Sequence, residues 1–425
     1  MLGLRRSAAL LTAAALIAGG CGTSRDEAPT TAAAPAQNPA GLVAVTVRVD
    51  PALAQAPFHV PRQALVPPGW TMSLWARVPK ARLAAWTPDG ALLVSVPAEG
   101  NVLKLTPGNP QRRQVLLDGL NAPHGLAFAG STLYVAESNQ VDAYTYADGA
   151  ATGRRVVAPG LPDNSSPELH GAYMHALKSV AVGADGAVYF SIGSTGNISA
   201  EDRSATPERA TIMRIPPQGG PYRVFARGVR NGTGLAVAPD GWVWTAVNNR
   251  DNIADPRGRV VQAYVDDHPP ESFARLTPGR DLGWPYCNPD GTGGSVPLVR
   301  DVQTNPDGAE LDCSALPPVE QTLGAHSAPL GVSFVSGGLP APYSEGALVG
   351  VHGSWNRQSP RAPEVSFFPW RNGTLGDQQT LVGGFQAPDG SRWGRPVAAV
   401  VGPDGAVYVT DDDAGAVYRA APPGR

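Results

Sequence analysis

The sequence predicts an all-β protein folded as a six-bladed β-propeller of four-stranded antiparallel blades. The main signal is a phrase of strand-forming residues around Asp-Gly that returns along the chain. Asp-Gly forms the tight turn of a β-hairpin, and Val, Tyr, Leu and Trp favour strands. Recurrence at this spacing is typical of repeat folds whose units bury one another's faces. The 50 Gly and 43 Pro among 425 residues also suit a turn-rich β protein.

Six hairpins are expected, four with Asp-Gly and two weaker ones in second and fifth place. They cover residues 87–96, 125–137, 184–192, 239–247, 331–351 and 403–410. A further short strand follows each hairpin, at residues 101–105, 141–146, 210–215, 259–265, 364–368 and 416–419. Three or four strands in each of six units indicate a six-bladed propeller. The alternative is a β-sandwich or a pair of barrels with coincidental turns, which leaves the recurrent order unexplained.

The amino terminus is expected to be an export signal over residues 1–21. Arg5 and Arg6 precede an apolar core at 7–17 that is too short to span a bilayer. The following Ala-Gly-Gly-Cys21 resembles a bacterial lipobox, in which the Cys becomes the lipidated first residue; simple cleavage at the Ala/Gly cluster is the alternative. The protein is therefore expected to be exported to the periplasm or cell surface and anchored to the membrane by a lipid.

Two further segments are expected after the signal. Residues 22–60 are rich in Ala, Pro and Thr and have too little apolar mass to fold, so they are expected to form a disordered tether. Residues 61–425 are expected to form the propeller domain. Cys287 and Cys313 remain as an even pair in an exported chain, which predicts a disulfide. The net charge of −3 and a pI near 6.2 give no basic footprint for nucleic acid.

Five segments carry polar residues that a hairpin does not require, in loops that a propeller would place at one mouth of its central channel. They are residues 171–179, 228–234, 247–255, 324–331 together with 351–357, and 391–397. His175 offers an imidazole that acts as a base near neutral pH, although a structural hydrogen bond is the commoner role of a single His. Lys178 lies close by and is one of three lysines among 33 basic residues.

Arginines and amides recur in the other segments. Arg230 and Asn231 offer a forked donor and an amide, which suit a carboxylate or a developing oxyanion. The oxygens around Asn249 and Arg250 are of the kind that Ca²⁺ prefers, and a capped turn is the alternative. The sequence has no nucleophile elbow, phosphate-binding loop, zinc motif or dinucleotide fingerprint, so nicotinamide and ATP chemistry lack support.

The last two segments add a stacking face and more positive charge. Trp355 lies among polar residues, an arrangement that suits a sugar or a planar ring, while a Trp packed under a loop is the alternative. Arg357 and Arg395 join Arg230 and Lys178 as basic groups in an acidic protein. Such a concentration of positive charge suits a small anionic ligand with several carboxylates.

At these segments the chain resembles the glucose/sorbosone dehydrogenase family of quinoproteins, and its sorbosone-dehydrogenase-like branch more than the soluble glucose dehydrogenases. The match covers roughly residues 65–420. The motifs occur in the family's order: His175-Ala-Leu-Lys-Ser with its Asp-Gly hairpin, Ile192-Gly-Ser, Arg230-Asn231, Asn248-Asn-Arg-Asp251, Gly283-Trp-Pro-Tyr-Cys287, His326-Ser-Ala-Pro-Leu-Gly331, His352-Gly-Ser-Trp-Asn-Arg357 and Gly394-Arg-Pro-Val.

This resemblance implies a propeller that holds pyrroloquinoline quinone (PQQ), a planar ortho-quinone tricarboxylate, together with Ca²⁺. It implies that His175 takes the proton from the sugar's anomeric hydroxyl while a hydride passes to the quinone, and that Arg230 and Asn231 stabilise the developing charge. The implied cofactor-binding residues are Lys178, Arg230, Asn231, Trp355, Arg357 and Arg395. The backbone carbonyls of Asn249 and Arg250 are the implied Ca²⁺ ligands.

The implied function is PQQ-dependent oxidation of an aldose or sugar aldehyde, sorbosone-like or glucose-like, with electrons passed to a quinone or cytochrome. Thr233 stands where the glucose enzymes have Gln, and a second family arginine near Arg395 is displaced to Arg392 or replaced by Trp393, so glucose itself is not implied as the substrate. Two alternatives remain. One is a non-catalytic, carbohydrate-binding propeller lipoprotein. The other is a Ca²⁺-dependent propeller lactonase, which would use acidic or amide metal ligands from several blades.

Overall fold

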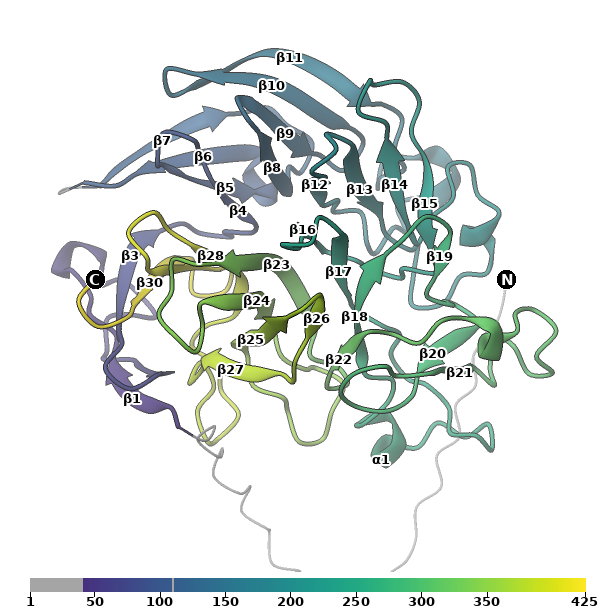
Figure 1. The fold of residues 1–425 in the computed structure, drawn as a ribbon. Coiled ribbons are helices and arrows are strands. Elements are labelled where there is room, and N and C mark those ends of the chain that lie inside the picture. The colour runs from purple at the N-terminus through teal and green to yellow at the C-terminus, as the bar shows by residue number, and fades with distance from the viewer. Residues whose placement is uncertain (1–40, 109–110) are drawn as a thin grey trace, which may run out of the picture. The chain divides into compact units, whose positions relative to one another are not determined.

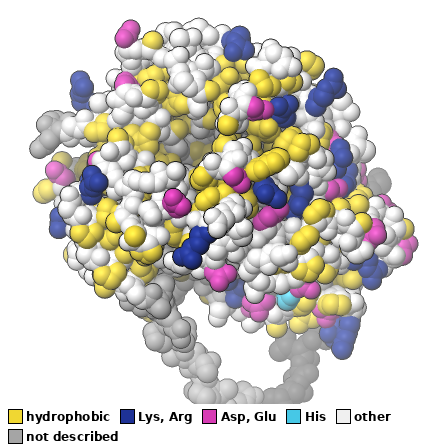
Figure 2. All heavy atoms as spheres, in the orientation of Figure 1, with side chains coloured by type: hydrophobic (Ala, Val, Ile, Leu, Met, Phe, Trp, Pro, Cys, Tyr) yellow, Lys and Arg dark blue, Asp and Glu magenta, His cyan; other side chains and the backbone are white. Residues whose placement is uncertain are grey.

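The protein is seen in a computed structural model that describes residues 41–108 and 111–425. Six antiparallel sheets surround a common centre as the blades of a propeller, which confirms the predicted fold (Figure 1). The expected export signal, Cys21 and the first part of the expected tether lie outside the described residues. On the face drawn in Figure 2, acidic and basic side chains are interspersed, as expected for a net charge of −3.

The strands of each blade follow one another from the centre outwards, and the first strand of every blade lies nearest the centre (Figure 1). Blade 1 contains β4 (Ala84–Trp86), β5 (Leu92–Val96), β6 (Asn101–Thr106) and β7 (Arg112–Leu117). Blade 2 contains β8 (Gly125–Ala129), β9 (Thr132–Ala136), β10 (Val141–Ala147) and β11 (Ala150–Ala158). Blade 3 contains β12 (Val180–Val182), β13 (Val188–Ile192), β14 (Thr211–Ile215) and β15 (Arg223–Arg227), with β19 (Arg280–Asp281) parallel to its edge.

Blade 4 contains β16 (Gly234–Val237), β17 (Val243–Val247), β18 (Glu271–Leu276) and β22 (Gln321–Leu323). Blade 5 contains β23 (Pro329–Ser336), β24 (Glu345–Val351) and β25 (Glu364–Arg371), and β25 pairs with both β26 (Thr374–Leu375) and β27 (Gln379–Val382). Blade 6 contains β28 (Pro396–Val401), β29 (Val407–Asp411), β30 (Ala416–Ala421) and β3 (Thr71–Arg77). Short 3-10 turns occur at η1 (Pro51–Leu53), η2 (Pro97–Glu99), η3 (Pro167–Leu169), η4 (Glu201–Arg203) and η5 (Cys313–Ala315).

The ring is closed by backbone pairing between distant parts of the chain. β3 lies antiparallel to β30, with Thr71 opposite Ala421 and Arg77 opposite Ala416. The outermost strand of the last blade therefore comes from the start of the domain. Closure of this kind leaves no large open sheet edge between the first and last blades.

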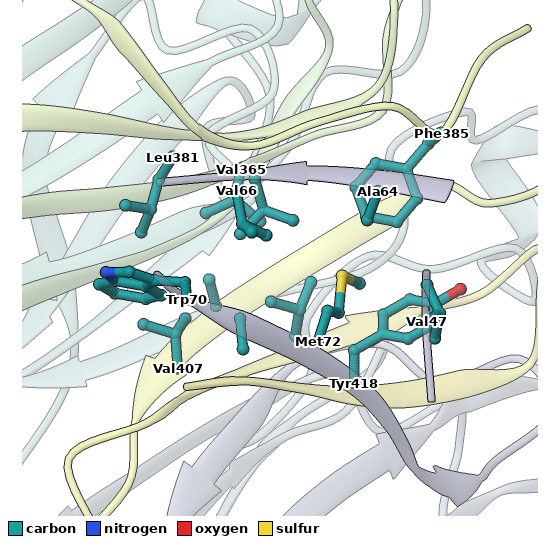
Figure 3. Close-up of a cluster of buried hydrophobic side chains, with 14 of the residues drawn as sticks. Val47, Ala64, Val66, Trp70, Met72, Val365, Leu381, Phe385, Val407 and Tyr418 are labelled. Carbon is teal, nitrogen blue, oxygen red and sulfur yellow. The ribbon is translucent and has the colours of Figure 1, made fainter. Parts of the chain in front are cut away.

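The disordered tether was predicted to extend to residue 60, but the segment just before the propeller is folded. β1 (Val43–Thr46) pairs with β2 (Gln63–Val66), and the chain between them buries Val47 and Phe58. In Figure 3, Val47, Ala64 and Val66 lie in one cluster with buried side chains of blades 5 and 6. The Ala- and Pro-rich average composition concealed a short alternation of Val residues that suits a strand.

The third strand of blade 4 is also corrected. The sequence predicted it at residues 259–265, but Gln262–Val265 form the single helical turn α1 and the strand is β18. Phe273 on β18 is fully buried and packs edge-on against Trp244 and Phe368, so packing between blades 4 and 5 decides which apolar run enters the sheet. The short alternation at 259–265 was an ambiguous signal.

The loop after β18 contains β20 (Cys287–Pro289) and β21 (Leu298–Arg300), which pair with each other. The predicted disulfide between Cys287 and Cys313 is present, with 5.7 Å between the two Cα atoms. Within the described residues, no helix has the length and apolar character needed to cross a membrane.

Candidate functional site

The candidate residues gather at one end of the propeller, here called the channel mouth. Strands of a blade alternate in direction, so the segment that leads into the first strand and the loop that leaves the second strand lie at the same end. The channel mouth is formed by these segments from all six blades, and the Asp-Gly turns lie at the opposite end. The predicted site residues from the segments before β12, β16 and β28 therefore share one end of the molecule.

His175 is held in one tautomer in the segment before β12. Its Nδ1 lies 3.0 Å from the carbonyl oxygen of Ser194 and 2.9 Å from the Ser194 hydroxyl. A carbonyl oxygen only accepts hydrogen bonds, so Nδ1 carries the hydrogen and Nε2 keeps a free lone pair. Burial, reinforced by repulsion from Arg230, lowers the pKa of His175 to about 3, and the imidazole is neutral at pH 7.

Gly193, at the end of β13, allows His175 to approach this closely. A Cβ at Gly193 would stand 2.6 Å from both the Cβ and the carbonyl oxygen of His175. Any larger residue there would push the imidazole away from Ser194. The Gly-Ser pair after β13 therefore fixes the position of the base as well as its tautomer.

Arg230, in the segment before β16, is buried beside His175. Its Nη1 donates to the carbonyls of Asn248 (3.0 Å) and Asn249 (2.9 Å), and its Nη2 donates to the side-chain oxygen of Asn197 at 3.1 Å. An ion pair to Asp251 at 3.5 Å balances part of its charge. The guanidinium is thus fixed by fully formed hydrogen bonds and brings a positive charge next to a neutral base.

The structure places Asn231 and the expected metal ligands around Arg230. Asn231 is half-buried, and its carbonyl accepts a hydrogen bond from the backbone N–H of Asn248. Asn249 is tied down through its own N–H, which donates to Glu271 at 2.6 Å. The Arg250 side chain points away into a buried ion pair with Asp301 at 2.6 Å, so only its backbone is available to a ligand.

Lys178, an expected cofactor contact, is held by backbone carbonyls. Its side chain is completely buried, and Nζ donates to the carbonyls of Pro162 (2.9 Å) and Ala176 (2.7 Å) over the ring of Tyr173. Burial lowers the pKa of Lys178 to about 7. In this structure Lys178 fastens the loop that carries His175.

A second charged cluster, here called the Asp412 cluster, lies at the channel mouth. Asp412 pairs with Arg395 at 2.9 Å, with Arg82 at 2.8 Å and with Nε2 of His352 at 3.4 Å. Burial opposes ionisation, but His352 and the two arginines hold the pKa of Asp412 well below its usual range. Arg395 alone was predicted, and it keeps about two fifths of its side chain exposed.

Sequence reasoning missed Arg82 and His124 in this region. Arg82 precedes β4 and His124 precedes β8, so both occupy the same place in their blades as Arg395 does before β28. That position relative to the first strand was the available signal. His124 donates from Nδ1 to the carbonyl of Lys178, and burial together with the charge of Arg82 lowers its pKa to about 3.

Trp355 and Arg357 lie on the loop between β24 and β25. The Trp355 side chain is 73% exposed, although its neighbour Asn356 donates to Asn252 at 3.1 Å. Arg357 donates to the carbonyl of Asp266 and forms an ion pair with Asp267 at 3.3 Å. This loop is therefore fastened to the loop of blade 4 and presents a large aromatic face to solvent.

Known proteins match most of the chain. A family model described as TrAA12-like matches residues 64–420. The structure is similar to the holo form of the PQQ domain of pyranose dehydrogenase from Coprinopsis cinerea, with a TM-score of 0.71 and 20% identity over 85% of this chain and 97% of that chain. A calcium structure of a family AA12 carbohydrate-active enzyme from Trichoderma reesei gives a TM-score of 0.68 and 19% identity over 84% and 96% of the two chains.

Two further matches are more distant or shorter. PQQ-bound aldose sugar dehydrogenase from Streptomyces coelicolor gives a TM-score of 0.55 and 14% identity, over 84% of this chain and 99% of that chain. An uncharacterized protein of Borreliella burgdorferi is 27% identical over 266 residues, which are 61% of this chain and 62% of that relative. At these identities the solved structures show a shared fold.

The names of these structures agree with the family resemblance found in the sequence motifs, while the sorbosone-dehydrogenase-like branch stays a prediction. The family match extends from the start of the propeller almost to its last strand. The chain therefore belongs to the TrAA12-like family.

Proposed function

We propose that this protein is a PQQ-dependent dehydrogenase that oxidises an aldose or a related sugar aldehyde. The observation that carries the proposal is the pair formed by His175 and Arg230. A neutral imidazole with a free Nε2 lone pair lies beside a buried guanidinium at the channel mouth. The pyranose and aldose sugar dehydrogenases that share the fold are described with PQQ, which supports the same cofactor here.

The residues at the channel mouth fit a planar, anionic quinone. Buried nitrogen atoms of Arg82 (Nε) and His124 (Nε2) have no hydrogen-bond partner among the described residues, and Nε2 of His352 has only its contact with Asp412 at 3.4 Å. Arg395 and Arg82 supply positive charge, and Asp412 offsets only part of it. Arg82, His352 and Arg395 would hold the carboxylates of the cofactor, while Arg230 would face its reactive carbonyl.

Calcium fits less well than the quinone. Carbonyl oxygens such as that of Asn249 are suitable Ca²⁺ ligands, but here this carbonyl already accepts a hydrogen bond from the cationic Arg230. Among residues 41–108 and 111–425, no group of three or more His, Cys, Asp or Glu side chains could hold a metal ion. We therefore assign no step to Ca²⁺ and include it in the assay because a Trichoderma reesei relative is described as a calcium structure.

The chemistry expected of the chain follows from these positions. When bound, the quinone would accept the hydride that leaves the anomeric carbon of the sugar. Nε2 of His175 would take the proton from the anomeric hydroxyl, and its low pKa keeps it free to do so at neutral pH. Arg230 would stabilise the negative charge that develops next to it, with Asn231 alongside. The exposed face of Trp355 would contact the sugar or the cofactor.

The cellular setting is part of the same proposal. The signal-like amino terminus and Cys21 support an exported lipoprotein at the periplasm or cell surface. Electrons would then pass to a membrane quinone or a cytochrome. A sugar that reaches the channel mouth from outside the cell would be oxidised without entering it.

A dye-linked assay tests the proposal. The purified protein is incubated with PQQ, with and without Ca²⁺, and reduction of an electron-accepting dye is followed across a panel of sugars. The wild type is expected to reduce the dye with at least one sugar, and His175→Ala is expected to lower the rate by about 10²–10⁴-fold because the base is lost. His59→Ala is the matched control, since His59 is exposed and its side chain makes no hydrogen bond or ion pair within the described part of the chain.

Binding measured by calorimetry separates the possible outcomes. PQQ is expected to bind His175→Ala as tightly as it binds the wild type, because the substitution removes the base and not the charged cluster. Failure of PQQ to bind at micromolar concentration would overturn the proposal. Sugar binding without turnover would indicate the non-catalytic alternative, and chelator-sensitive lactone hydrolysis without dye reduction would indicate the lactonase.

A further inference from the structure

One Asp-Gly hairpin differs from the other three in the residue that follows Gly. In three of the four Asp-Gly hairpins the residue after Gly is a buried alanine: Ala91 (2% exposed), Ala187 (0%) and Ala406 (0%). In the hairpin of blade 4 this residue is Trp242, which is 41% exposed. Arg275 lies over the Trp242 ring, at 5.8 Å from its centroid. The other hairpins show that this position needs no large side chain, and a part-exposed indole gains little from burial.

Trp242 lines an open cleft of about 510 Å³ between blades 3 and 4. The cleft lies at the end of the propeller with the Asp-Gly turns, opposite the channel mouth. Tyr189 and Phe225 form its floor, with ring centroids 4.9 Å apart in an edge-to-face arrangement. Its volume is in the range of about 300–1,000 Å³ that is typical of small-molecule sites.

Charged groups surround this aromatic floor. Arg214 lies over the Tyr189 ring, at 5.8 Å, and donates to Asp185 at 2.9 Å. Arg223 also lines the cleft; it is exposed, and its side chain makes no hydrogen bond or ion pair within the described part of the chain. Tyr189 and Phe225 are buried, so the indole of Trp242 is the exposed aromatic surface of the cleft. An indole beside carboxylate and guanidinium groups suits a ring with apolar C–H faces and hydroxyls at its edge.

These features favour a sugar over a protein as the ligand of the cleft. A stable protein interface buries about 1,200–2,000 Å² in total around an apolar centre, whereas here a single aromatic cleft is bounded by charges of both signs. A small acid would be attracted by Arg223 but would meet Asp185 at the same cleft and Asp240 in the adjoining one. The hydroxyls of a neutral sugar ring can donate hydrogen bonds to the carboxylates and accept them from the guanidinium groups.

We infer that the cleft of Trp242, Tyr189 and Phe225 is a carbohydrate-binding subsite, separate from the channel mouth. It takes one or two rings of a neutral β-linked glycan, whose equatorial substituents leave flat C–H faces for the indole. The inference goes beyond the proposed dehydrogenase activity and does not depend on PQQ. Binding at this end of the propeller would hold the protein on a glycan while the channel mouth stays open.

The test is glycan binding to the full chain without PQQ. Cellohexaose, xylohexaose and chitohexaose are titrated separately, with tryptophan fluorescence and calorimetry as readouts. At least one is expected to bind the wild type saturably, and Trp242→Ala is expected to weaken binding about tenfold through loss of the stacking contact. The substitution restores the residue of the other hairpins, so folding is expected to be kept.

Val115→Ala is the matched control, because it removes an exposed apolar side chain (51% exposed) from blade 1, which does not line the cleft. It is expected to leave hexasaccharide binding unchanged, while Trp242→Ala is expected to leave dye reduction with a monosaccharide unchanged. The inference is overturned if no hexasaccharide binds the wild type at millimolar concentration, or if Trp242→Ala binds as tightly as the wild type. Neither result depends on whether the protein reduces the dye.

Discussion

At the scale of single residues, the tautomer of the candidate base His175 is set by Ser194, which holds Nδ1 and leaves Nε2 free. Ser194 offers a neutral hydroxyl and a carbonyl to His175, and the hydrogen bond to the carbonyl raises the pKa of His175 without outweighing burial and Arg230. Burial and Arg230 then keep the pKa near 3. The sequence identified His175 and Arg230 as candidates, but the tautomer depends on a contact made only after the loop before β12 folds onto the end of β13.

The pH profile of Ser194→Asp tests this account. A carboxylate beside the Nδ1 hydrogen favours the imidazolium, so the pKa of His175 is expected to rise by roughly 1–3 pH units. Activity of the variant is then lost as the pH falls through this higher pKa, while the wild type keeps an unprotonated base at the same pH. The measurement is kcat/KM for dye reduction between pH 4 and 8.

Ser194→Ala provides the control for that series. It removes the hydroxyl but keeps the backbone carbonyl that fixes the tautomer, so the pH profile is expected to match that of the wild type. If Ser194→Asp also keeps the wild-type profile, the contact with Ser194 does not control the base.

At the scale of elements, local turn chemistry explains the hairpins, and the long loop of blade 4 shows the limit of local reasoning. Asp-Gly turns and strand-forming residues act over a few positions, so five of the six third strands were placed correctly. Residues 248–270 lack such a turn, and the strand there was assigned to 259–265 when packing against Trp244 selects β18. The disulfide was predictable because Cys21 falls in the expected export signal, which leaves Cys287 and Cys313 as one pair.

The disulfide is expected to stabilise the loop that follows β18. It joins cysteines 26 residues apart, and restricting a loop of this size in the unfolded chain contributes roughly 3 kcal/mol. The double variant Cys287→Ser/Cys313→Ser is therefore expected to unfold at lower denaturant concentration than the wild type. The wild type in a reducing buffer is the control and is expected to match the variant, and equal midpoints for the oxidised wild type and the variant would contradict the expectation.

At the scale of the whole molecule, the segment before β2 belongs to the folded domain. Phe58 is buried edge-on between Trp393 (6.4 Å between ring centroids) and Tyr418 (5.9 Å), and Arg77 lies over its ring. Trp393 is two residues from Arg395 in the Asp412 cluster. Packing by the amino-terminal segment therefore supports a blade that contributes to the channel mouth.

Truncation tests this role. A protein that begins at residue 41 keeps every described residue and serves as the reference. A protein that begins at residue 61 loses β1 and Phe58 and is expected to be less stable. Phe58→Ala isolates the main contact and is expected to cost about 3–5 kcal/mol, measured by thermal unfolding. Equal stability of the proteins that begin at 41 and 61 would show that the segment only covers the surface.

The sequence by itself determined the repeat, the propeller and the shared end on which His175, Arg230 and Arg395 lie, because these depend on turns and strand patterns a few residues long. Only the tertiary structure decided which side chains meet. Lys178 is drawn into the protein by backbone carbonyls of its own loop, and Arg82 joins Arg395 through Asp412, which is 330 residues away from Arg82 in the chain. Contacts across such separations form when the ring closes through β3 and β30, and no local pattern encodes them.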